Sequence, residues 1–177
     1  MTDQAGEQLE PGAPEIDRIQ VQMLMQQIRD NQNLLLGVVG GVVAAGIGAA
    51  IWALITVVAN YQIGWMAVGV GLLVGYAVRV CGKGIDKTFG LVGAVLSLLG
   101  CFSGNLLTTC ILISRHQNIP FLHILNGLNP ELIIRLTEAT FNFMDLLFYA
   151  IAVYEGYKVS FRKISKQELE TLNPWPK

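Results

Sequence analysis

The sequence predicts an all-α membrane protein, a compact bundle of four transmembrane helices preceded by an amphipathic helix. Hydrophobic residues make up 53% of the 177 residues and charged residues only 14%, whereas a soluble domain carries about 25% charged residues. The mean hydropathy is +0.49. Apolar runs long enough to cross a bilayer recur along the chain, with short polar turns between them. These three observations assign the chain to the polytopic membrane class.

The central stretch 63–105 reads as two spanning helices joined by a short basic turn. A glycine-rich segment with Arg79, Lys83 and Lys87 interrupts the apolar residues, which resume at Phe89. The same criterion places the four spans at about 33–59, 63–80, 89–114 and 140–161.

The two ends of the chain are more polar than its centre. Residues 1–14 contain several Gly and Pro residues and few apolar ones, so we expect them to be disordered. Residues 15–32 place Val21, Leu24 and Ile28 on one face, which predicts an amphipathic helix on the cytosolic side. Residues 162–177 are expected to form a polar cytosolic tail.

The longest loop, 115–139, is too apolar for a fully solvated segment and is expected at the membrane interface. Within it Asn129, Pro130 and Glu131 predict a helix start, with Asn as the N-cap, Pro at the first position and an acid in the first turn. We expect this helix to continue through Arg135 into the fourth span.

The distribution of basic residues predicts the orientation. Lys and Arg cluster in the turn at 79–87 and in the tail after the fourth span, whereas the turn after the first span has none. Because cytoplasmic loops carry the excess of Lys and Arg, we expect both termini on the cytoplasmic side of a bacterial inner membrane.

Small residues recur at spacings of three and four in three spans, which predicts helix faces that pack closely. These positions are Gly37, Gly41 and Ala45 in the first span, Gly71 and Gly75 in the second, and Gly93, Ser97, Gly100 and Gly104 in the third.

Polar residues inside the spans are the candidates for a functional site. Asp145, Asn142 and Tyr149 share one face of the expected fourth span together with Glu138, and Asn105 lies in the outer half of the third span. One interpretation is a proton or cation site. The other, which we favour, is an interhelical hydrogen bond from Asp145 to Asn105.

The sequence gives no support to an enzyme. No catalytic set, metal-ligand spacing or cofactor motif is present, and the three cysteines have neither zinc nor redox spacing. A net charge of −1 argues against nucleic acid as a partner. We expect a structural or accessory membrane protein that packs against a partner protein or forms a homo-oligomer. The alternative is a small ion or proton transporter, or a channel component, that uses Asp145, Asn142 and Asn105.

Three stretches carry a resemblance to a known group. GWMAVGVGLLVGYAVR (Gly64–Arg79), GKGIDKTFGLVGAVLSLLGCFSGNLL (Gly82–Leu107) and MDLLFYAIAVYEGYK (Met144–Lys158) resemble an uncharacterised group of small bacterial membrane proteins. The resemblance implies four spans and brings no activity with it. Some members of the group carry an N-terminal zinc ribbon, which this chain replaces with the acidic segment and the amphipathic helix.

Overall fold

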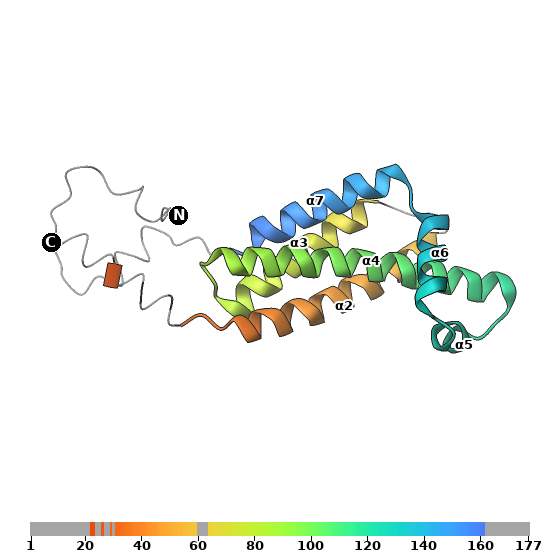
Figure 1. The fold of residues 1–177 in the computed structure, drawn as a ribbon, viewed down its shortest axis with the longest axis horizontal. Coiled ribbons are helices and arrows are strands. Elements are labelled where there is room, and N and C mark those ends of the chain that lie inside the picture. Colours follow the sequence, from red (N-terminus) through yellow and green to blue (C-terminus); the bar gives the residue numbers. More distant parts are fainter. Residues whose placement is uncertain (1–21, 24–25, 27–28, 30, 60–63, 162–177) are drawn as a thin grey trace. The chain divides into compact units, whose positions relative to one another are not determined.

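The computed structural model describes residues 22, 23, 26, 29, 31–59 and 64–161 (Figure 1). Every regular element within these residues is an α-helix, which confirms the prediction of an all-helical bundle. The segments 1–14 and 162–177, and most of the expected amphipathic helix 15–32, lie outside the described residues.

The helices from residue 34 onward are α2 (Leu34–Ala59), α3 (Trp65–Gly82), α4 (Lys87–Gln117), α5 (Phe121–Asn126), α6 (Pro130–Thr140) and α7 (Phe143–Val159). By length and composition α2, α3 and α4 can each cross a membrane. The pair α6 and α7 passes the same test only together, and a bend of 106° separates its two helices. The structure therefore contains three helices able to span a membrane, and a fourth span if the bent pair is counted as one.

Neighbouring chain segments in the bundle alternate in direction. Gly37, near the start of α2, lies against Gly82 at the end of α3, and the ring of Phe89 at the start of α4 packs beside both. At the same end, Gly90 of α4 lies against Phe161, just after α7. The start of α2, the basic turn and the end of α7 are thus gathered at one end, so α2 and α4 run one way and α3 and α7 the other (Figure 1).

Helix α7 packs against α3 through residues too small to keep the backbones apart. A Cβ added at Gly71 would lie 2.8 Å from the Cα of Ala152. One turn further on, a Cβ at Gly75 would lie 3.0 Å from the carbonyl oxygen of Gly156. Such close approach of backbones is how helices associate where apolar burial alone gives no driving force.

Helix α4 approaches the same face of α7. A Cβ at Gly156 would collide with the Ser97 hydroxyl and lie 2.9 Å from the carbonyl oxygen of Gly93. The Ser160 hydroxyl donates to the carbonyl oxygen of Gly156 at 2.6 Å. The small positions of α3 and α4 therefore meet on a single stripe of α7.

The first span packs on α4 in the same manner. A Cβ at Gly100 would lie 3.2 Å from the Cβ of Ala45, and one at Gly104 would lie 3.2 Å from the ring of Trp52. The space beside Gly41 is filled by side chains of Leu96 and Val78.

The structure corrects the sequence interpretation of residues 130–161. Asn129 caps α6 as predicted, since its side chain accepts from the Leu132 N–H at 2.7 Å. The helix does not continue into the fourth span, because Phe141 and Asn142 are extended (φ −80°, ψ 122° and φ −110°, ψ 159°). A new helix begins at Phe143 instead of 140.

Candidate functional site at the start of helix α7

The start of α7 is fixed by its own polar side chains. The main-chain N–H of Asn142 donates to Oδ2 of Asp145 at 2.9 Å. Asn142 is the N-cap and Asp145 the third helical residue, so this bond is the acidic part of a capping box. Asp145 is only 8% exposed. Its negative charge lies at the helix N-terminus, where the helix dipole stabilises it.

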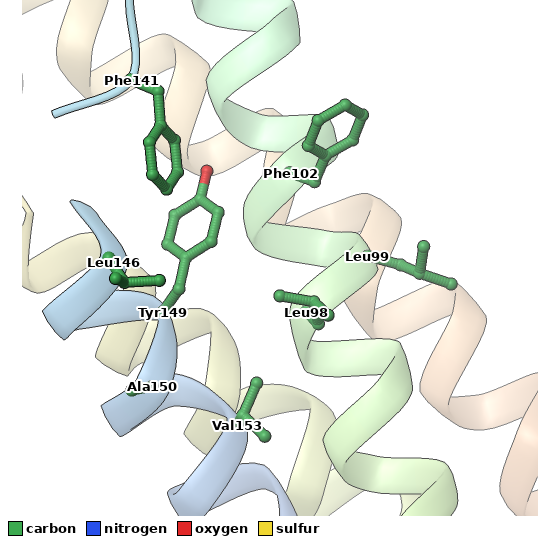
Figure 2. Close-up of a pocket in the computed structure, with 8 residues that line it drawn as sticks. All are labelled: Leu98, Leu99, Phe102, Phe141, Leu146, Tyr149, Ala150 and Val153. Atoms are coloured by element: carbon green, nitrogen blue, oxygen red, sulfur yellow. The ribbon is translucent and has the colours of Figure 1, made fainter. Parts of the chain in front are cut away.

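Tyr149, one turn further along α7, joins that helix to α4. Its hydroxyl donates to the carbonyl oxygen of Cys101 at 3.2 Å. Its ring meets two aromatic neighbours edge-on, Trp52 of α2 at 6.4 Å and Phe141 at 5.8 Å between centroids. Figure 2 shows the Tyr149 ring standing between α7 and α4 with Phe141 above it. The residue therefore links three separate parts of the chain.

The polar residues of α4 lie at the same level of the bundle. The side chain of Asn105 interacts with Tyr149, and the carboxylate of Asp145 lies near enough to influence Tyr149 electrostatically. The hydroxyls of Thr108 and Thr109 donate back to main-chain carbonyls one turn earlier, at 2.8 and 3.0 Å. The structure thus brings together all four residues selected from the sequence: Asp145, Asn142, Tyr149 and Asn105.

The grouping differs from the sequence prediction in two respects. Glu138 does not share their face, because it belongs to α6 on the other side of the 106° bend. The hydrogen bond that holds the Asp145 carboxylate is local, to Asn142, whereas Tyr149 is the residue that reaches across to α4. A hydrogen bond between α7 and α4 is therefore provided by Tyr149.

Two residues of α2 add polar groups that sequence reasoning missed. Trp52 is 1% exposed and Thr56 is 2% exposed. Neither the indole Nε1 of Trp52 nor the hydroxyl of Thr56 has a hydrogen-bond partner among the described residues. The sequence does not indicate this role, because single Trp and Thr residues are common within the apolar run of a spanning helix.

A second omission concerns the stripe of α7 formed by Ala152, Gly156 and Ser160. These residues have the same spacing of four that marked the small faces of the other spans. Tyrosines at 149, 154 and 157 surround the stripe in the sequence and conceal it. Counting small residues at every fourth position, regardless of the intervening aromatics, would have found it.

The chemistry of this region is that of hydrogen bonds to the main chain. Within residues 31–59 and 64–161, no group of three or more His, Cys, Asp and Glu residues could hold a metal ion. The Asp145 carboxylate and the Tyr149 hydroxyl are both engaged by backbone groups. The arrangement fixes the position of α7 relative to α4.

Comparison of the chain with protein-family models, with curated proteins and with solved structures found no match.

Proposed function

We propose that this chain is a non-enzymatic, multi-pass membrane protein with a structural or accessory role. The observation that supports this most directly is the use made of Asp145, the one acid buried among the described residues of the spans. Its carboxylate accepts from the main-chain N–H of Asn142, the N-cap of α7. A carboxylate that caps a helix contributes to the stability and orientation of that helix. In a transport pathway, by contrast, the carboxylate would have to bind and release an ion.

In this proposal α7 is the fourth span. Its 17 residues cover about 25 Å at 1.5 Å per residue, slightly less than the roughly 30 Å of hydrocarbon in a typical bilayer. A short span is accommodated by local thinning and by snorkelling of flanking residues, and Lys158 stands at the end of α7 to do so. Both termini then face the cytoplasm of a bacterial cell, as the basic turn and the resemblance to bacterial four-span proteins favour.

Helix α6 lies along the membrane surface in this arrangement. Its 106° bend from α7 sets it nearly parallel to the bilayer when α7 crosses it (Figure 1). Its exposed face carries Glu131, Arg135 and Glu138, and Arg135 bonds to Glu131 at 2.8 Å. Leu132 and Leu136 are half-buried on the opposite face. This division of polar and apolar faces is typical of an interfacial helix.

The surface proposed to meet a partner is the end formed by α5. The small faces are used inside the bundle, so they leave no site for another chain. Helix α5 has no buried residue, and its Leu122 is 68% exposed. Apolar side chains exposed beyond the spans mark contact surfaces. A partner protein or a second copy of the chain would cover them.

A photo-activated cross-linking residue at position 122, tested in native membranes, shows whether another protein covers this surface. The proposal expects a discrete protein adduct from position 122 and none from position 91 on α4, where Leu91 is 62% exposed toward lipid. Lipid adducts alone at both positions, with a monomer after mild extraction, would contradict it. Proton or cation flux in liposomes that disappears in Asp145→Asn would instead establish the transport alternative.

A further inference from the structure

The charged residues of the bundle are divided unevenly between its two ends. The basic end is where α3 and α7 finish and α4 begins, since Gly82 lies against Phe89 there and Gly90 against Phe161. Within residues 64–161 this end has four cations and two acids: Arg79, Lys83, Lys87 and Lys158, with Asp86 and Glu155. The opposite end has two cations and three acids: Arg115 and Arg135, with Glu131, Glu138 and Asp145. The basic end is therefore positive, and the opposite end is slightly negative.

The cations of the basic end are available to bind an anion from outside the chain. The side chains of Lys83, Lys87 and Lys158 are exposed. None of the three forms an ion pair with an acid in the part of the chain that the structure describes, whereas Arg135 at the opposite end bonds to Glu131 at 2.8 Å. The positive charge of the three lysines is therefore not cancelled by direct pairing.

Exposed tyrosines place these cations at the depth of lipid headgroups. Tyr76 is 61% exposed and Tyr154 is 58% exposed, and both lie within two turns of the basic end of their helices. Tyrosine is enriched at the membrane–water boundary, where its ring meets hydrocarbon and its hydroxyl meets water. Arg79 follows Tyr76 by three residues, and the Nζ of Lys158 lies 5.4 Å from the centre of the Tyr154 ring. In a bilayer these cations therefore lie beside the phosphate groups of the lipids.

A lipid headgroup with a net negative charge fits this surface. Basic residues beside a bilayer attract anionic lipids, and the attraction falls off within a Debye length. Lipid is favoured over an acidic protein, because the tyrosines put the cations at the bilayer surface. We propose that the basic end binds anionic bilayer lipids by their phosphate groups, through Lys83, Lys87 and Lys158. The inference requires that the bundle crosses a membrane, and it does not depend on the accessory role proposed above.

Native mass spectrometry of the full-length protein tests the proposal. The protein is reconstituted in equimolar phosphatidylglycerol and phosphatidylcholine with identical acyl chains, so that contacts with the apolar helix faces are the same for both lipids. The expected result is several-fold more phosphatidylglycerol than phosphatidylcholine retained on the protein, with an excess that shrinks as the ionic strength rises. Equal retention of the two lipids at low ionic strength would overturn the proposal. Displacement of the phosphatidylglycerol by soluble glycerol phosphate would show a site for free phosphate instead, and would overturn it as well.

Paired substitutions locate the selectivity on the protein. Lys83→Gln with Lys87→Gln removes two exposed cations of the basic end, and the excess of phosphatidylglycerol should fall toward parity. Arg115→Gln with Arg135→Gln removes the same number of exposed cations from the opposite end and should leave the excess unchanged. An equal fall in both variants would mean that only the net charge matters, which contradicts a binding surface at the basic end.

A second measurement uses the unaltered protein, in case the lysine variant does not fold. Phosphatidylglycerol with a photo-activated headgroup is mixed into phosphatidylcholine vesicles, and the labelled peptides are mapped by mass spectrometry. Adducts are expected on the peptides that contain Lys83 and Lys87, several-fold above those on the peptide that contains Arg135. Adducts spread evenly over these peptides would count against the proposal.

Discussion

Gly71 of α3 and Ala152 of α7 touch through their main chains, with no room between them for a side chain. A Cβ at Gly71 would lie 2.8 Å from the Cα of Ala152 and 3.0 Å from its carbonyl carbon. Backbone atoms cannot turn aside as a flexible side chain does. Replacement of Gly71 must therefore separate the two helices.

We expect Gly71→Ala to lower the free energy of unfolding by about 1–3 kcal/mol, the usual cost of overpacking. Gly69→Ala on the same helix is the matched control, because nothing lies within 4 Å of its added Cβ. That change should be neutral or stabilising, since alanine favours helix over glycine by about 1 kcal/mol. Thermal denaturation in detergent measures both, and equal midpoints for the two variants would contradict the packing described here.

Tyr149→Phe should destabilise the bundle slightly. The change removes the hydroxyl that donates to the carbonyl oxygen of Cys101 and interacts with Asn105, and it keeps the ring contacts with Trp52 and Phe141. Interhelical hydrogen bonds in membranes average about 0.6 kcal/mol, so a loss of about that size is expected. Tyr154→Phe, at a side chain 58% exposed, is the control and should have no effect. A loss of several kcal/mol for Tyr149→Phe would mean that the hydroxyl does more than make its contacts with Cys101 and Asn105.

Asp145→Asn should be milder than Asp145→Leu. Asparagine keeps an oxygen that can accept from the Asn142 N–H and loses only the charge at the helix N-terminus, about 0.3–1 kcal/mol. Leucine removes the acceptor as well, and loss of a cap costs about 0.5–2 kcal/mol. Thermal stability of the two variants gives the order. Asparagine ranking below leucine would argue that the carboxylate charge itself has another task.

Thr56→Val should be neutral or stabilising, although Thr56 is buried. Its hydroxyl has no partner among the described residues, and an unmade buried hydrogen bond costs about 1–3 kcal/mol. Thr108→Val is the matched comparison, because the Thr108 hydroxyl donates to the carbonyl oxygen of Gly104 at 2.8 Å. The midpoint of Thr56→Val should therefore exceed that of Thr108→Val. The reverse order would indicate that Thr56 binds a group such as a buried water.

Reporter fusions test the proposed topology. Lys83 is the C-cap of α3 and lies just before α4, whereas Asn118 is the C-cap of α4, at the other end of that 31-residue helix. A reporter at Asn118 should respond outside the cell, and reporters at Lys83 and Lys177 inside. A cytoplasmic response from Asn118 would exclude four spans with both termini inside.

Features that depend on residues close together in the sequence could be predicted, whereas features that depend on neighbouring helices could not. The cap of α6 was predicted because Asn129 acts on a residue only three positions later. The break before α7 was not, since Asn142 and Asp145 have a capping spacing and were interpreted as one polar helix face. The missing partner of the Trp52 indole depends on how α2, α4 and α7 pack, which no short stretch of sequence records.

The late position of α7 in the chain has a consequence for biogenesis. This helix packs against α3 and α4, both of which leave the ribosome before it does. Until it arrives, Gly71, Gly75, Gly93 and Ser97 face lipid without the backbone that they fit. A chain that lacks α7 therefore leaves these glycine faces uncovered. Docking of α7 covers them and completes the packing of α3 and α4.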